Sequence, residues 1–120
     1  MDRECFPGEP WEPTDDALWI ASYNGEPAGY AAAKHSQHFP DWAYLSRAGV
    51  LPGFRGKGIQ RRLIQSRCRW AWRSGLTGAY TYTLDNPASG NALIGCGFRL
   101  FSPGITVHEP DERWWVRTWQ

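Results

Sequence analysis

A strand-like run that passes through a glycine-rich turn into an amphipathic helix constrains the fold of this chain most. The run WAYLSRAGVLP spans 42–52, and the turn GFRGKG follows at 53–58. From Gly58 to Ser74 the apolar side chains recur at helical spacing on one arc, with arginines opposite them. A strand, a tight turn and a helix that packs back onto a sheet are the parts of an α/β domain.

Two residues interrupt the apolar arc of the predicted helix. Gln60 and Arg67 occupy positions where the spacing calls for apolar side chains. Either the helix is not wholly buried there, or these two side chains have a role of their own.

The rest of the chain predicts the element order βββαβαββ. Two strand-like runs flank Asn24 and Gly25, a dipeptide that accepts the positive φ angles of a tight hairpin turn. The segment 77–84 predicts a further strand, and 86–98 predicts a short helix that ends at Gly97. FRLF at 98–101 and RWWVRTW at 113–119 predict the last two strands.

Length and composition predict one domain over 17–120, preceded by an irregular, acidic and proline-bearing lead-in at 1–16. The net charge of +1 argues against a nucleic acid or an anionic membrane as the main partner of the chain. No run is long and apolar enough for a membrane span, and the start lacks the parts of a signal peptide.

The cysteines and histidines indicate neither a disulfide framework nor a metal site. The chain has three cysteines, far apart and without a CxxC pair, and His35 and His38 have no third ligand near them in the sequence. We therefore expect no metal and a reducing, cytoplasmic location.

The glycine turn is suited to hold phosphate oxygens. Amides at a helix N-terminus have no intrahelical partner, and glycines let a ligand approach the backbone closely. Gly56 and Gly58 would allow that approach, and Arg55 and Lys57 would add positive charge at the rim. A Walker motif fails because Ile59 stands at its lysine position, and the dinucleotide fingerprint fails because Arg61 stands at its third glycine.

Two motifs resemble those of the GNAT N-acetyltransferase superfamily. AGVLPGFRGKGIQRRLI resembles its acyl-CoA-binding signature, with Gln60 at the last position, which is usually small. NPASGNALIGCGF resembles its second helix motif, at the right distance downstream. The matching residues are Arg55, Gly56, Lys57, Gly58 and Ile59 in the first motif, and Asn86, Ser89, Gly97 and Phe98 in the second.

The resemblance implies a GNAT-like acyl-CoA N-acyltransferase fold. This is an α/β fold with a mixed, mostly antiparallel sheet and two flanking helices, parallel only where the two central strands flank the long helix. The chain would be a short member that lacks the usual N-terminal strand and helix pair. We therefore expect a homodimer in which a neighbouring chain completes the acceptor groove.

The resemblance also implies acetyl-CoA as co-substrate, held between the strand that ends at Leu51 and the strand 77–84. Its pantetheine arm would pair with the backbone at Gly49, Val50 and Leu51, and an N–H near Val50 would polarise the thioester carbonyl. Asn86 and Ser89 would hold the arm from the other side. The glycine turn, with Arg55 to Gln60, would bind the diphosphate.

The sequence offers several candidates for the general base and for the general acid, and it does not single one out. An amine acceptor must lose a proton, and the candidates to accept it are Tyr44, Ser46, His35 and Asp85. The family's usual tyrosine, which protonates the thiolate, is replaced by Leu93. Its substitute would be Ser89, Tyr80, Tyr82 or water, unless the thiolate leaves without help.

We expect transfer of an acetyl group from acetyl-CoA to a primary amine of a small molecule or protein, by direct attack. The alternative is a catalytically weak CoA-binding or protein-interaction module on the same fold. A third option is a basic RNA-binding domain that uses Arg62, Arg69 and Arg73, but a solvated helix face explains these arginines with fewer assumptions.

Overall fold

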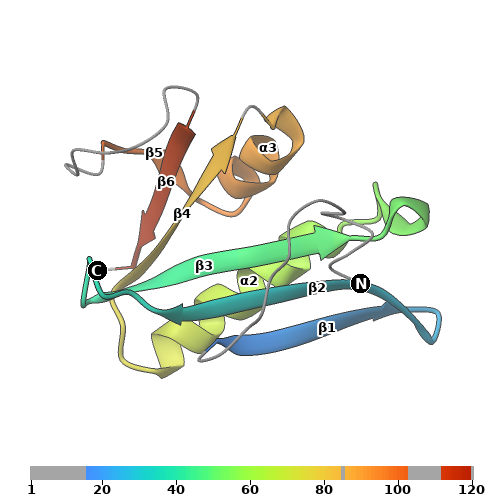
Figure 1. Ribbon diagram of the computed structural model, residues 1–120, viewed down its shortest axis with the longest axis horizontal. Helices are drawn as coiled ribbons and strands as arrows, with labels where there is room; N and C mark the ends of the chain where they lie inside the picture. The colour runs from blue at the N-terminus through green and yellow to red at the C-terminus, as the bar shows by residue number, and fades with distance from the viewer. Residues whose placement is uncertain (1–15, 85, 103–111, 120) are drawn as a thin grey trace.

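The computed structural model describes residues 16–84, 86–102 and 112–119. Along these residues the elements follow the predicted order βββαβαββ (Figure 1). The expected lead-in lies outside the described residues except for Asp16. The elements are β1 (Ala17–Tyr23), β2 (Glu26–His35), β3 (Trp42–Val50), the 3₁₀ turn η1 (Pro52–Phe54), α2 (Ile59–Arg73), β4 (Gly78–Leu84), α3 (Pro87–Gly95), β5 (Arg99–Leu100) and β6 (Glu112–Thr118).

The strands form one mixed sheet in the order β1-β2-β3-β4-β6-β5. Among the described strands only β3 and β4 pair in parallel, on either side of α2 in the chain, and all other neighbours are antiparallel. This confirms the predicted fold class. A parallel pair needs a crossover connection, and α2 supplies it.

The β1–β2 hairpin turns at the predicted dipeptide. Asn24 has a φ of 51° and Gly25 a φ of 82°. Positive φ at both central residues matches the right-handed twist of the flanking strands.

Both helices pack on one face of the sheet (Figure 1). The main core joins Ile64 and Cys68 of α2 and Leu93 of α3 to small or aromatic residues of the strands, among them Ala43 and Trp115. The small strand residues let α2 lie close to the sheet. At Gly29, a Cβ would stand 2.9 Å from the Gly49 carbonyl oxygen and 3.3 Å from the Ile59 side chain.

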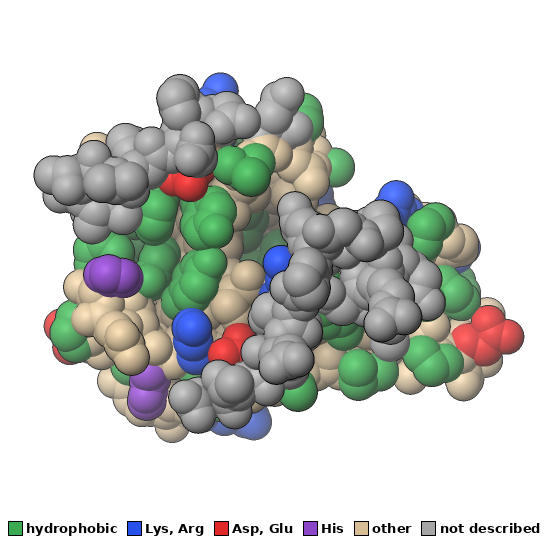
Figure 2. Space-filling view, viewed as in Figure 1, with side chains coloured by type: hydrophobic (Ala, Val, Ile, Leu, Met, Phe, Trp, Pro, Cys, Tyr) green, Lys and Arg blue, Asp and Glu red, His purple; other side chains and the backbone are tan. Residues whose placement is uncertain are grey.

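The opposite face carries an aromatic cluster over β3, β4 and β6. Ring stacking joins Tyr44 to Tyr80 at 5.2 Å and Tyr80 to Trp114 at 6.0 Å between centroids. Figure 2 shows hydrophobic side chains gathered on this face. The sheet therefore separates a helix-covered core from an aromatic surface.

Arg67 and Gln60 resolve the conflict in the predicted helix. Arg67 is 4% exposed, so the apolar arc is not opened to solvent at that position. Gln60 is half-buried and bonds a residue of α3. Both side chains therefore have structural partners, which sequence spacing could not show.

Candidate functional site

Strands β3 and β4 diverge soon after they pair. Their parallel register covers only Trp42–Tyr44 against Gly78–Tyr80. Just beyond it, the Thr81 hydroxyl donates a hydrogen bond of 2.8 Å to the Leu45 carbonyl oxygen, where the next ladder bond would stand. The backbone of β3 past Leu45 therefore faces a gap between the strands.

A β-bulge lies on the other edge of β3 at the same level. The register with β2 shifts between Ala32 and Lys34, so that Ala33 opposes both Leu45 and Ser46. A bulge bends its strand and raises the local twist, and it often lies next to a functional site. Bulge and divergence together turn the end of β3 away from β4.

A groove of about 530 Å³ occupies the resulting space beside α2 and α3. It brings together most residues predicted to bind the cofactor. Leu51 and Lys57, also predicted, do not line it; the Lys57 ammonium lies 5.0 Å from the ring centroid of Tyr23. The lining residues are Ala48, Gly49, Val50, Phe54, Arg55, Gly56, Gly58, Ile59, Gln60, Arg61, Asn86, Ala88, Ser89 and Ala92.

The glycine turn leaves helix amides open to this groove. Gly56 and Gly58 have φ angles of 79° and 78°, and beyond their chain neighbours no described atom lies within 4 Å of where their Cβ atoms would be. The N-terminus of α2 has no side-chain cap and no acidic residue in its first turn. Arg55 Nε donates to the Val50 carbonyl oxygen at 3.1 Å, which ties the turn to the end of β3. An anion can approach this end of α2.

Asn86 and Ser89 form the opposite wall. The Asn86 side-chain oxygen caps α3 by accepting a bond of 3.1 Å from the Ser89 amide. Gln60 Nε2 donates to Ser89 Oγ at 3.1 Å, which joins α2 to α3 across the groove. The Ser89 oxygen is an acceptor in that bond, so its hydroxyl hydrogen can point to a ligand.

A second cavity of about 290 Å³ adjoins the groove. Both are lined by Ala48, Gln60, Asn86 and Ser89, so the two spaces meet where β3 and β4 diverge. The other residues that line this cavity are Tyr44, Leu45, Ser46, Arg47, Ile64, Arg67, Thr81, Tyr82, Thr83, Leu84 and Leu93.

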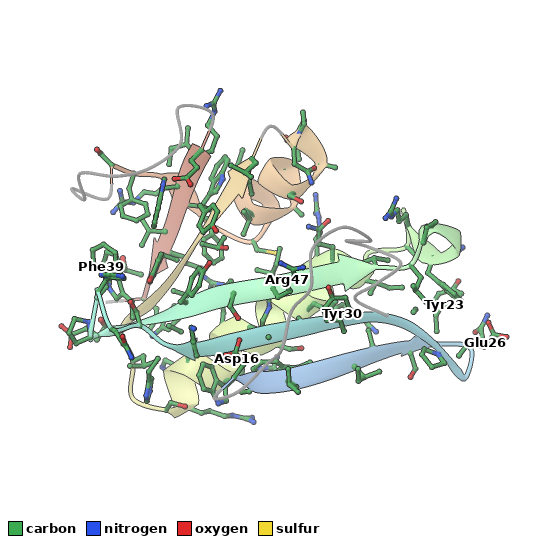
Figure 3. The ribbon with its side chains drawn as sticks, viewed as in Figure 1. Asp16, Tyr23, Glu26, Tyr30, Phe39 and Arg47 are labelled. Carbon is green, nitrogen blue, oxygen red and sulfur yellow. The ribbon has the colours of Figure 1, made fainter. Side chains whose placement is uncertain are left out.

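Ser46 is the predicted proton acceptor with the best surroundings. Its hydroxyl donates a hydrogen bond to the Asp16 carboxylate, and Ser46 lines the second cavity. Figure 3 shows Asp16 at the start of β1 and Arg47, the neighbour of Ser46, on β3. The sequence analysis placed Asp16 in the irregular lead-in and gave it no role, since only the folded sheet brings it beside Ser46.

Tyr44 lines the same cavity, but its phenol is held neutral. Burial, and then the neighbouring Tyr82, raise the pKa of Tyr44 above its ordinary value. This disfavours the predicted role of proton acceptor and favours that of hydrogen-bond donor.

Of the other acid–base candidates, Ser89 and Tyr82 line the second cavity, whereas His35 and Tyr80 do not. His35 pairs in register with Ala43, seven residues before Val50, which is roughly 23 Å along the strand. The Tyr80 hydroxyl bonds that of Ser36 at 2.7 Å, and Tyr80 lines neither cavity. Asp85 lies outside the described residues. Leu93 is 4% exposed and offers no proton to the second cavity.

The described thiols are unsuited to nucleophilic chemistry. Cys68 and Cys96 are buried and free, and burial raises the pKa of each thiol. Within the described ranges, no three of the histidine, cysteine, aspartate and glutamate side chains come close enough to hold a metal ion. In the same ranges, no helix has the length and apolar character needed to span a membrane.

The mixed sheet, the divergence of β3 and β4 and the open glycine turn match the fold that the two sequence motifs imply. The model of the acetyltransferase (GNAT) family matches residues 2–98. The chain therefore belongs to this family, as the two sequence motifs indicate. A search of curated protein sequences returns no significant match.

Solved structures of acetyltransferases share the fold. A proposed streptothricin acetyltransferase from Bacillus anthracis str. Ames, in complex with acetyl coenzyme A, is 21% identical, with a TM-score of 0.73 over 90% of this chain and 65% of that one. The PaiA N-acetyltransferase from Thermoplasma acidophilum, in complex with coenzyme A, is 15% identical, with a TM-score of 0.73 over 88% and 62%. A Bacillus subtilis acetyltransferase in complex with CoA is 15% identical, with a TM-score of 0.74 over 88% and 78%. This chain thus spans less than two thirds of the length of the first two of these proteins.

Proposed function

We propose that this protein transfers an acetyl group from acetyl-CoA to a primary amine by direct attack. The observation that carries the proposal is the groove itself, which joins the open N-terminus of α2 to the gap between β3 and β4. Family membership and the acetyl-CoA or CoA bound in the similar structures support it.

The cofactor would bind along this groove. Its diphosphate would accept hydrogen bonds from the amides between Gly56 and Gln60, where the helix dipole favours negative charge. Its pantetheine arm would lie along Gly49 and Val50, opposite the hydroxyl of Ser89. Arg55 would act through the turn, which it holds against β3.

The thioester would lie where the two cavities meet, near Ala48 and Val50. A backbone N–H of β3 at this point would donate to the thioester oxygen as charge develops on it. Such a donor needs no side chain, so Val50 could serve through its backbone alone.

The amine would attack from the second cavity. An ammonium near pKa 10.4 must first lose a proton, and the Asp16 carboxylate could accept it through the Ser46 hydroxyl. The amine nitrogen then bonds the acetyl carbon, the carbon–sulfur bond breaks, and the nitrogen loses a second proton to water, so that a neutral amide forms. The thiolate takes a proton from Tyr44, Ser89 or water, or leaves as it is.

A CoA-binding or protein-interaction module is the second candidate. The observation in its favour is Leu93, a buried leucine that stands where the family's usual acid would lie. Such a module would bind the cofactor at the same groove without turnover. A location in the cytoplasm remains a prediction for either candidate.

A thiol-release assay separates the two candidates. Wild-type protein is incubated with acetyl-CoA and a panel of primary amines, and free CoA thiol is measured against time. Acetyl transfer predicts thiol release that depends on the amine, with the acetylated amine found by mass spectrometry. Saturable binding of acetyl-CoA with no amine-dependent release from any member of the panel would support the module instead.

A further inference from the structure

Arg67 is a buried cation that the site described above does not use. It lies on α2 and is 4% exposed. Its Nε donates to the Leu63 carbonyl oxygen at 3.1 Å, and its Nη1 donates to the Ala32 carbonyl oxygen at 3.3 Å. Because Ala32 directly precedes the bulge, these bonds fix the guanidinium between α2 and the irregular part of the sheet.

The charge of Arg67 is not balanced by a carboxylate of the described residues. Burial lowers the pKa of Arg67 to about 10, which still leaves it charged at neutral pH. Its two hydrogen bonds to described residues go to neutral carbonyl groups, and the thiols of Cys68 and Cys96, which lie near it, have raised pKa values. The carboxylates that the structure describes belong to Asp16, Glu26, Asp41 and Glu112, and it shows no ion pair between any of them and Arg67.

Arg67 also lines the second cavity, the space from which the amine would attack. Ser46, with its bond to Asp16, lines the same space, and Tyr82 and Leu84 of β4 contribute to its walls. An anion bound by Arg67 would therefore lie in the space from which the amine would attack. The volume of about 290 Å³ has room for a small molecule.

A purely structural role for Arg67 does not account for these facts together. One donor is enough to satisfy the Ala32 carbonyl, whereas a guanidinium carries five N–H groups. Burial of a cation is costly, and among the described residues no carboxylate offsets that cost for Arg67, so a ligand that brings an anion would do so. A planar guanidinium fits a carboxylate with two parallel hydrogen bonds.

We propose that Arg67 binds a carboxylate of the acceptor, so that the acceptors of this enzyme are small amines that also carry a carboxylate, such as amino acids. The inference rests on the proposed acetyl transfer. The carboxylate does not react; it holds the acceptor while the amine nitrogen bonds the acetyl carbon and CoA leaves. One of the two protons lost by the ammonium goes to the Ser46–Asp16 pair, the other goes to water or to the departing thiolate, and no further reactant is needed.

Matched acceptors test the proposal in the wild-type protein. Each amino acid of a panel is compared with its carboxamide and with the amine that lacks the carboxyl group, for example phenylalanine, phenylalaninamide and phenethylamine. We expect kcat/KM for the best amino acid to exceed that of its two neutralised counterparts by ~10–100-fold, the range of a charge-assisted hydrogen-bonded pair. Equal or lower kcat/KM for the amino acid would overturn the inference.

Two variants locate the effect at Arg67. Arg67→Met should bring the kcat/KM ratio between amino acid and decarboxylated amine close to one, through a rise in KM for the amino acid. Arg67→Lys keeps the positive charge but loses the planar guanidinium with its two parallel donors, so it should retain part of the kcat/KM ratio. Arg69→Met is the matched control, because Arg69 is exposed on the same helix, and it should leave the ratio as in wild type.

Folding is checked by thermal unfolding and by acetyl-CoA binding of each variant. If Arg67→Met does not fold, the decision falls to the wild-type ratios and to Arg67→Lys. The role of Arg67 would be contradicted if Arg67→Met kept the wild-type ratio of kcat/KM between amino acid and decarboxylated amine. If only Arg67→Lys folds, the wild-type ratio in that variant would contradict it. Transfer to amines regardless of the carboxyl group would overturn this inference and leave the proposed function standing, whereas no transfer to any acceptor would overturn both.

Discussion

At the scale of single residues, the site depends on side chains and backbone angles that do two jobs. Gly58 adopts a left-handed backbone conformation and also leaves the N-terminus of α2 accessible to a ligand. Asn86 caps α3 and also lines the groove. Substitutions at these positions need controls that separate folding from binding.

We predict that Gly58→Ala weakens acetyl-CoA binding and lowers stability. A Cβ at a φ of 78° costs about 1–2 kcal/mol, and it would project into the space meant for the diphosphate. Chemical denaturation measures the loss of stability, and calorimetric titration measures the loss of affinity for acetyl-CoA. Gly53→Ala is the control, since Gly53 has no positive φ and no atom within 4 Å of its Cβ position. Equal Kd values for the two variants would contradict the role of Gly58.

We predict that Tyr44 stays protonated at neutral pH and well above it. Its pKa in the folded protein is raised above the value of about 10 for an exposed tyrosine. The stability that comes from its neutral form is therefore fully present below pH 10 and is lost as the pH rises above that value. Urea unfolding at pH 8 and pH 11 should show a smaller loss of stability in Tyr44→Phe than in wild type. An equal loss in both would contradict the prediction.

At the scale of elements, the junctions between strands and helices build the site. The sequence was sufficient for the order of elements, because the Asn24–Gly25 hairpin and the arc of α2 are local patterns. It also identified most of the groove, since the glycine turn and Asn86 belong to contiguous motifs. It could not find the bulge at Ser46, the Thr81 hydroxyl bond or the burial of Arg67, because these depend on contacts between distant segments.

We predict that Asn86 has two separable roles, one in capping α3 and one in binding acetyl-CoA. Asn86→Ala removes the cap of α3 and should lower stability by about 0.5–2 kcal/mol while weakening acetyl-CoA binding. Asn86→Asp keeps the capping oxygen but loses the amide donor, so it should retain the stability and still bind the cofactor less tightly. Chemical denaturation measures the free energy of unfolding of both variants, and calorimetric titration measures their affinity for acetyl-CoA. Wild-type affinity in Asn86→Asp would show that Asn86 serves only as a cap.

At the scale of the whole molecule, an exposed apolar edge makes association worth testing. Leu18 and Ile20 on the edge strand β1 are 57% and 64% exposed. We predict a homodimer, as the sequence resemblance suggested, and light scattering on a size-exclusion column should give twice the mass of one chain. A monomer mass at high protein concentration would contradict the prediction and leave the acetyl-CoA groove unaffected.

The central claim is that the open amides of α2 and the gap between β3 and β4 hold coenzyme A. Isothermal titration of wild-type protein with acetyl-CoA measures this most directly. The account predicts saturable binding of one acetyl-CoA per chain, competed by CoA and not by RNA. A well-folded protein that gives no heat and no shift of its melting temperature with acetyl-CoA would contradict it.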